Sequence, residues 1–412
     1  MSLALRPRTE RGEAVVAAAA SLVDTLAGRA SQADATNRVV RQNFDDLIAS
    51  GVAAAFVPEA LGGFGLESIH DWVLTIATLA RGDASTAIAI NMHLGVSRGM
   101  ALAYHEAMAR SGREGAATKG LEETLRQLAV GEMLICATAT EPGTDNLHPR
   151  TEAVADSDGW RINGRKIFVT LSPIATHLAM NLRVRGDDGD RLASVMLPMD
   201  TPGLIPEDDW DALGMRSSGS QSIRFEDARV PLQDVRTIGP WGRWSVPMLQ
   251  NRAVANLPLV GAFMGIAEAA HDLALTHLAG SSRVDRPAVE NSGVQHVVAE
   301  MALELARCRA TLGAAAVEMD GYFARHSGLD AQIEAAHQLM ADYQAAKWTV
   351  NQGAIDIVSK AMDLLGGGGY TNTHVLARLY RDVRAGPFMQ PFGPAELREY
   401  VGQVTLGRYP ER

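Results

Sequence analysis

The chain has 412 residues, a formal net charge of −10 at pH 7 and 47% hydrophobic residues. This combination excludes an intrinsically disordered chain, which needs low hydrophobicity with high net charge, and it disfavours nucleic-acid binding, which needs a basic face. The N-terminal segment turns charged after a short apolar patch, unlike a secretory signal, and no charge-free apolar run of about 18 residues is present. We therefore expect a cytoplasmic protein with no nucleic-acid or membrane partner.

The first predicted region is helical and runs from residue 9 to about residue 132. It is rich in alanine, and its apolar residues recur with the i, i+3, i+4 spacing of amphipathic helices that pack against each other. The glycine- and proline-containing segment 57–65 interrupts the pattern and predicts a loop. We expect an N-terminal helical domain over residues 1–132.

The next region has shorter apolar segments that favour β-strands, at 160–170 and 192–198. Glycine-containing clusters at 156–159, 163–164 and 186–189 have the composition of tight turns. Short strands separated by Asn-Gly and Asp-Gly turns are typical of antiparallel sheets. We expect a middle antiparallel β-domain over residues 133–240.

Three long helical segments follow, at 245–279, 291–326 and 330–362. Helices of this length predict a bundle that often buries a face against another subunit. Four consecutive glycines at 366–369 should end the third helix. We expect a C-terminal helical bundle domain over residues 241–412, which makes the fold class α+β, with a helical, then β, then helical order.

Most chemical motifs are missing from the sequence. There is no P-loop and no HExxH, and the two cysteines, Cys136 and Cys308, lack the spacing of a zinc site or a disulfide framework. We therefore expect no metal. His93 is a lone histidine on an apolar helix, which is typical of a hydrogen-bonded core or pocket-edge side chain.

Six segments, in order, resemble motifs of the acyl-CoA dehydrogenase superfamily of flavoproteins. They are 57–65 VPEALGGFG, 81–86 RGDAST, 138–143 TATEPG, 163–170 NGRKIFVT, 213–222 LGMRSSGSQS and 364–370 LLGGGGY, the last followed by Arg381-Asp382. The resemblance spans about residues 50–385 and implies the same helical–β–helical layout. It also implies a homo-oligomer, commonly a tetramer, with bound FAD, or FMN as the alternative.

Carried over position by position, the resemblance implies that several residues contact the flavin. Ala139 and Thr140 would meet the isoalloxazine, and Phe168 and Thr170 would cover its other flank. Gly366 and Gly367 would approach the pyrophosphate of a neighbouring subunit's FAD, and Arg283 could replace a family arginine that is lost at Ser281. The residues that this resemblance assigns to the cofactor are Ala139, Thr140, Phe168, Thr170, Arg283, Gly366 and Gly367.

The carboxylate base that the family uses for α-proton removal is absent from both of its usual positions. Counting from the Arg-Asp motif places Gln390 at one position, and the first C-terminal helix places Asn251 at the other. An amide can hydrogen-bond a carbonyl but cannot accept a proton at neutral pH. The same matching assigns Asn146 and Arg252 to substrate binding.

Three functions are compatible with these features. The leading expectation is an FAD-dependent α,β-dehydrogenase of an acyl thioester such as an acyl-CoA, with an electron-transfer flavoprotein as acceptor. The alternative is a flavin-dependent monooxygenase that acts on a small non-CoA molecule and is supplied by a flavin reductase, with His93 as the obvious acid/base group. A flavin-binding protein without catalysis is the third.

Overall fold

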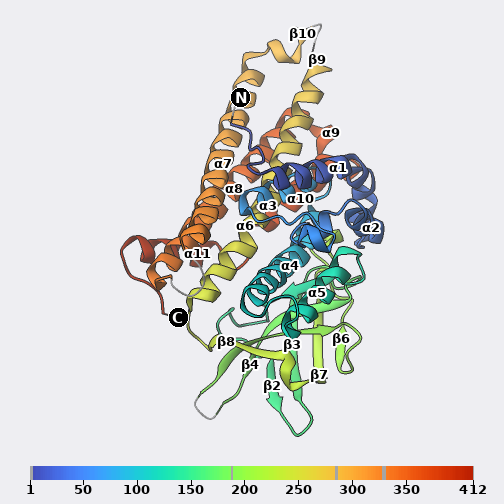
Figure 1. Cartoon of the computed structure of the whole chain (residues 1–412). Coiled ribbons are helices and arrows are strands. Elements are labelled where there is room, and N and C mark those ends of the chain that lie inside the picture. The colour runs from blue at the N-terminus through green and yellow to red at the C-terminus, as the bar shows by residue number, and fades with distance from the viewer. Residues whose placement is uncertain (1–2, 187–188, 284–285, 327–330, 412) are drawn as a thin grey trace.

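The computed structural model describes all residues except 1–2, 187–188, 284–285, 327–330 and 412. In Figure 1 the sheet lies at the bottom, the N-terminal helices cover its upper side, and the long C-terminal helices extend to the top. This helical–β–helical arrangement confirms the predicted fold class. The predicted domain boundaries at 132/133 and 240/241 stay predictions.

The N-terminal helices begin at side chains that accept hydrogen bonds from free backbone N–H groups. Thr9 caps α1, Ser68 caps α3 and Asp83 caps α4, which is the role that short polar side chains have at helix starts. The predicted loop at 57–65 is irregular apart from one 3-10 turn. The helices are α1 (Glu10–Thr36), α2 (Arg41–Ala49), α3 (Ile69–Gly82), α4 (Ala84–Ser111) and α5 (Ala116–Ala129).

The sheet has eight strands in the order β6-β7-β3-β2-β4-β5-β8, with β1 paired to β4. Two details differ from the prediction. Both β1 and β2 run parallel to β4, so the sheet is mixed. Asn163-Gly164 is not a turn but an irregularity inside β3, where the register with β7 shifts. The strands are β1 (Ile135–Thr138), β2 (Glu152–Ala155), β3 (Trp160–Val169), β4 (His177–Val184), β5 (Arg191–Pro198), β6 (Leu204–Pro206), β7 (Gln221–Val230) and β8 (Val235–Pro240).

The three long C-terminal helices lie where the periodicity predicts them. Strands β9 and β10 close the tip between α6 and α7 at the top of Figure 1. Gly366 ends α8 with a positive φ of 65°, as expected for the glycine run. The elements are α6 (Val246–Ala279), β9 (Ser282–Arg283), β10 (Arg286–Pro287), α7 (Ser292–Arg325), α8 (Ile333–Leu365), α9 (Gly367–Tyr370), α10 (Val375–Asp382) and α11 (Pro394–Thr405).

Helix α6 is the central helix of the core. Both α1 and α6 contain an 18-residue window long and apolar enough to cross a membrane, but the α6 window is 83% buried inside the protein. A Cβ atom built on Gly261 of α6 would lie 2.5 Å from the Val73 carbonyl oxygen of α3. The two helices therefore cross at a distance that only glycine permits.

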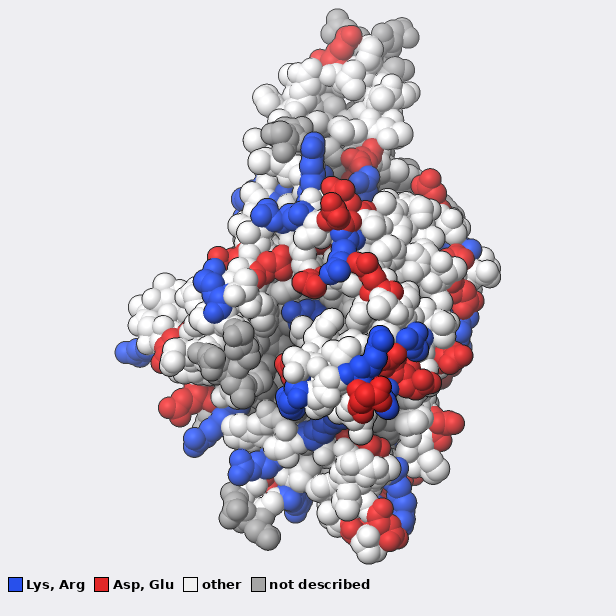
Figure 2. Space-filling model, viewed as in Figure 1, with Lys and Arg blue, Asp and Glu red and all other residues white. Residues whose placement is uncertain are grey.

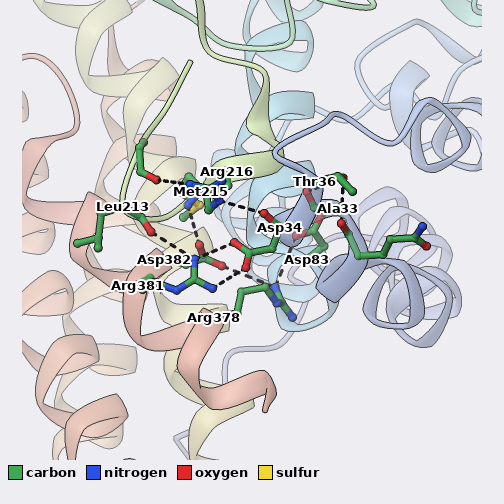
Figure 3. Close-up of polar contacts among 12 residues, drawn as sticks. Ala33, Asp34, Thr36, Asp83, Leu213, Met215, Arg216, Arg378, Arg381 and Asp382 are labelled. Atoms are coloured by element: carbon green, nitrogen blue, oxygen red, sulfur yellow. Dashed lines mark hydrogen bonds and ion pairs between the residues drawn. The ribbon is translucent and has the colours of Figure 1, made fainter. Parts of the chain in front are cut away.

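A buried charge cluster fixes the position of α10 (Figure 3). Arg381 pairs with Asp34 of α1 at 2.9 Å, and Asp382 accepts a hydrogen bond of 2.6 Å from the Met215 backbone N–H. Arg378 lies 3.6 Å from Asp382 and also 3.6 Å from Asp83, whose side chain caps α4. Burial raises the pKa of Asp382 to about 6. The Arg-Asp motif thus joins all three parts of the fold and sets where the chain continues toward residue 390.

Charged side chains of both signs are interspersed on the face shown in Figure 2. The described part of that face therefore offers no broad surface of a single sign. The whole chain has 38 basic and 48 acidic side chains, and on this face the two signs are mixed rather than gathered into one patch.

Candidate functional site

Two of the predicted site residues, 250 positions apart in sequence, meet in the structure. Gln390, in the segment between α10 and α11, donates a hydrogen bond from Nε2 to Thr140 Oγ1 in the loop after β1. Its Oε1 atom is buried and has no hydrogen-bond partner. The position of the family base thus carries an amide oxygen that is desolvated and free to accept a hydrogen bond.

The loop that carries Thr140 is fixed against β3. The Thr140 N–H donates to Thr138 Oγ1 at 3.2 Å, and its carbonyl accepts from the Ile167 N–H at 3.0 Å. The Thr138 hydroxyl in turn donates to the Ile167 carbonyl at 3.0 Å. Ala139 lies between these contacts. Both residues that were predicted to meet a flavin in this loop therefore have a set position beside β3.

Phe168 and Thr170 lie at the end of β3, where the register with β7 shifts again. Phe168 has a φ of 54°, which is uncommon for a residue other than glycine, and 53% of it is exposed. The Trp210 ring meets it edge-on, with 5.9 Å between centroids. Thr170 shares a 2.8 Å hydrogen bond with the Ser220 hydroxyl. An exposed ring held by a strained backbone is a platform for a flat ligand.

A fully buried ion pair joins β3 to the loop that carries Thr140. Lys166 Nζ of β3 is 2.6 Å from Glu141 Oε1, and the side chains are 0% and 2% exposed. Glu141 also accepts hydrogen bonds from the backbone N–H groups of Arg150 and Thr151. Burial lowers the pKa of Lys166 to about 8, while Glu141 opposes this shift. Breaking either partner would leave a buried charge.

Arg252 and Asn251 are neighbours on α6 but have different surroundings. Asn251 is exposed to solvent. Arg252 is partly buried, and its Nη2 atom is fully buried without a hydrogen-bond partner. Burial lowers the pKa of Arg252 to about 10. It lies close enough to Lys166 for the two cations to repel each other, and its assignment to substrate binding stays a prediction.

The segment around Gln390 is held by side chains that donate to four consecutive carbonyl groups. Lys347 donates to Met389 and, at 2.6 Å, to Phe392, and Tyr343 donates to Gln390 at 2.5 Å. Asn146 donates to Pro391 at 3.4 Å, and its Oδ1 atom is buried without a partner. We call residues 389–392 the Gln390 segment.

Lys347 and Tyr343 of α8 are 1% and 0% exposed, and the sequence analysis did not identify them. They lie one turn apart on a helix with an ordinary amphipathic pattern. In the sequence they look like surface residues, and only their burial in the structure distinguishes them. Burial lowers the pKa of Lys347 to about 7, and Glu396 opposes the shift. A neutral amine still has two N–H groups, which is the number that the two carbonyl groups need.

A hollow of about 220 Å³ opens beside the Gln390 segment. Its wall contains three carboxylates and three aromatic rings, and none of the residues that line it is a lysine or an arginine. Such a wall suits the cationic or neutral polar part of a ligand. It is lined by Asp145, Asn146, Leu147, Trp244, Pro391, Phe392, Glu396, Glu399, Tyr400, Gln403 and Pro410.

His93 is a structural residue, and its suggested acid/base role is corrected by the geometry. It is completely buried; its Nε2 lies 3.0 Å from the Ala53 carbonyl oxygen, and its Nδ1 accepts from the Ile135 N–H at 3.2 Å. Burial lowers its pKa to about 4. Because both ring nitrogens are bonded to backbone groups, neither can exchange a proton with a substrate. His93 instead ties α4 to the 3-10 turn at 52–54 and to β1.

The remaining predicted cofactor residues are not brought to this site within one chain. Gly366 and Gly367 lie beyond the end of α8, about 30 Å along the helix from Lys347. A Cβ built on either glycine would meet no other atom within 4 Å. Arg283 is in β9 at the tip of the long helices, and its side chain lies outside the described ones. Among the described residues no group of His, Cys, Asp and Glu could hold a metal ion.

Comparisons with known proteins assign most of the chain to domains of one family. Three family models match it: the acyl-CoA dehydrogenase N-terminal domain at residues 9–109, the middle domain at 135–228 and the C-terminal domain at 250–399. The chain is 35% identical to L-evernosamine nitrososynthase of Micromonospora sp., over 97% of this chain and 92% of that protein. It is 38% identical to amino sugar nitrososynthase DnmZ of Streptomyces peucetius, over 89% and 86%.

Other relatives are more distant. The mitochondrial short-chain specific acyl-CoA dehydrogenase of Bos taurus is 26% identical, over 90% of this chain and 84% of that protein.

Among solved structures, nitrososynthase from Micromonospora carbonacea var. africana aligns with a TM-score of 0.88 and 33% identity, over 99% of this chain and 100% of that one. KijD3 in complex with FMN and dTDP-3-amino-2,3,6-trideoxy-4-keto-3-methyl-D-glucose aligns with 0.87 and 33%, over 98% and 96%.

Proposed function

The chain belongs to the acyl-CoA dehydrogenase family, and on this scaffold we propose that it is a flavin-dependent monooxygenase that oxidises the amino group of a nucleotide-linked amino sugar. The relatives that support this proposal are the nitrososynthases, at 35% and 38% identity. Acyl-thioester dehydrogenation, the leading expectation from the sequence, is supported by more distant relatives such as the bovine short-chain specific acyl-CoA dehydrogenase, at 26%. The monooxygenase alternative is therefore preferred.

The observation that carries the proposal is the amide at position 390. Dehydrogenation of a thioester needs a base that removes the α-proton, and loss of a general base typically slows a reaction by about 10²–10⁴-fold. Gln390 cannot act as that base, and its Nε2 is already engaged with Thr140. Oxidation of an amine requires no such carboxylate, because the nitrogen lone pair is the nucleophile.

The residues around Gln390 fit a flavin. The exposed Phe168 ring offers a flat apolar face, and the unpartnered Gln390 Oε1 offers a hydrogen-bond acceptor. Ala139, Thr140 and Thr170 would complete the sheet side of this cradle. The reduced flavin would supply two electrons, so that one atom of O₂ enters the substrate and the other leaves as water.

The chain's own groups would bind and orient the amine. The carboxylates of the hollow, Asp145, Glu396 and Glu399, attract a protonated amino group toward the site. The Gln390 oxygen can accept an N–H without taking the proton, which leaves the nitrogen lone pair available once the amine is neutral. Lys347 and Tyr343 keep this oxygen in place by holding the backbone of the Gln390 segment.

The proposal is tested with the purified protein, FMN or FAD, a flavin reductase, NADH and air. The probe is the amino-keto sugar nucleotide found in the KijD3 complex, and the matched control is the same sugar nucleotide with a hydroxyl in place of the amine. We expect oxygen incorporation, seen as a mass gain, for the amine alone. Anaerobic reduction of the bound flavin by an acyl-CoA panel, with no oxygen incorporation into the amine, would show that the protein is a dehydrogenase.

The variant Gln390→Glu separates the two chemistries further. A carboxylate at this position should weaken amine oxidation, because its negative charge stabilises the protonated amine, whose nitrogen has no free lone pair. It should not create acyl-CoA-dependent flavin reduction, because a base alone does not supply a binding site for the thioester. Gln390→Ala, which removes the side chain without adding charge, is the control for simple loss of the hydrogen bond to Thr140.

A further inference from the structure

The charged groups buried near β3 do not sum to zero, and this matters for ligand binding. Three charged groups lie there: the Lys166–Glu141 ion pair, which is neutral as a unit, and Arg252. The formal charge of this buried group is therefore +1. A desolvated cation is expensive unless an anion or several acceptors accompany it.

The described residues provide no such compensation for Arg252. No described carboxylate lies within ion-pairing distance of its guanidinium, whereas Arg309 on α7 pairs with Glu268 at 2.6 Å. Its Nη2 atom is buried and unpartnered. Burial lowers its pKa, and no neighbouring acid opposes this shift. A guanidinium has five N–H donors in a fixed plane, so an unused edge is a ready site for an oxyanion.

We propose that Arg252 is the anion-recognition residue of this site and that its counter-charge arrives with the ligand. The inference rests on the proposed function for the identity of that ligand. Its chemistry is an anionic oxygen or a delocalised ring anion, and two sources can supply it. One is a phosphate of the nucleotide portion of the substrate or cofactor. The other is the ring system of the flavin after reduction, when it carries negative charge.

The location of Arg252 supports a role toward the ligand rather than toward the fold. It is near Lys166 of β3, the strand that also carries Phe168, and Lys166 pairs with Glu141, the residue that follows Thr140. The residue as a whole keeps partial exposure although Nη2 is buried. The accessible part of the side chain could therefore be reached by a bound group.

The first experiment compares the stability of the ligand-free protein for Arg252→Met and Arg309→Met. Arg252→Met removes an uncompensated buried charge and keeps an unbranched, though shorter, side chain, so we expect a midpoint of thermal unfolding equal to or higher than the wild type. Arg309→Met breaks the 2.6 Å pair and leaves Glu268 with only the 3.9 Å contact to Arg81, so its midpoint should fall by about 2 °C or more. Arg309 lies outside the proposed site and is the matched control.

The second experiment measures equilibrium affinities of the same variants for thymidine diphosphate, for FMN and for riboflavin, each flavin in the oxidised and the anaerobically reduced form. Arg252→Met should weaken one class by about tenfold or more, the usual loss when a hydrogen bond to a charged group disappears. Selective loss for both reduced flavins identifies the ring anion. Loss for thymidine diphosphate, or for both forms of FMN but not riboflavin, identifies a phosphate. Arg252→Lys should recover part of the affinity.

Two results would overturn the proposal. One is an Arg252→Met protein that is destabilised like Arg309→Met and binds every probe within about twofold of the wild type, because Arg252 would then act in the fold. The other is a variant that changes its oligomeric state with unchanged affinities, because the counter-charge would then come from a second copy of the chain. If Arg252→Met does not fold, Arg252→Gln serves in both experiments. Failure of the amine oxidation assay with intact anion binding would reject the proposed substrate and leave Arg252 unaffected.

Discussion

The buried lysine behind the Gln390 segment should make stability depend on pH. The pKa of Lys347 is lowered to about 7 in the folded protein, from 10.5 in the unfolded chain. Between these values the unfolded chain binds more protons than the folded one, so the free energy of unfolding rises with pH. From pH 7 to pH 9 this single group should add about 2 kcal/mol. Below pH 7 both states are protonated and the contribution is constant.

The variant Lys347→Met removes this titration and nearly preserves the length of the side chain. Urea unfolding of wild type and variant at pH 6, 7, 8 and 9 gives the difference in the free energy of unfolding, in which all other titrating groups cancel. We expect the variant's disadvantage to grow by about 2 kcal/mol between pH 7 and pH 9. A difference that is the same at all four pH values would refute the reasoning, since Lys347 would then be charged in the folded protein at pH 9.

Three further predictions concern the fold around the site. His93→Ala should lower the free energy of unfolding by about 2–5 kcal/mol, because two buried backbone groups lose their partner. Turnover per folded molecule should stay at the wild-type level. A selective loss of turnover would instead indicate a catalytic role for His93. Gly265→Ala should cost about 1–3 kcal/mol in urea unfolding by forcing α3 and α6 apart, whereas Gly28→Ala, where nothing lies within 4 Å, should be neutral or stabilising. Lys166→Met should cost about 3–5 kcal/mol, and adding Glu141→Gln should recover part of this; no recovery would mean that the ion pair is not the cause.

The long helices could be predicted from the sequence because their periodicity extends over many turns. The segment 291–326 corresponds to α7 at Ser292–Arg325, and 245–279 to α6 at Val246–Ala279. A two-residue signal such as Asn163-Gly164 is weaker, because the same pair fits a hairpin turn or a bulge. Here the pairing with strand β7 selects the bulge, because the Asn163 side chain forms hydrogen bonds with Asp227 across the sheet.

The site could be predicted only in part. Thr140, Phe168 and Gln390 were found through resemblance to a family, and the residues themselves suggested a core position for His93, as the structure shows. Lys347 escaped detection because a lysine on an amphipathic helix is normally solvated. Its burial depends on the segment 389–392 folding back over α8, and that packing leaves no local pattern in the sequence.

The contact between Thr140 and Gln390 closes a loop of 250 residues, and the Trp244 N–H donates to the carbonyl of Glu411 at 3.0 Å, close to the C-terminus. Contacts between such distant positions pay their loop-closure entropy before they stabilise anything, so they form late in folding. During synthesis on the ribosome, the sheet side of the site would be complete while Gln390 was still untranslated. Cofactor binding would thus require synthesis to pass residue 390, and a chain truncated before the Gln390 segment should bind the cofactor less tightly.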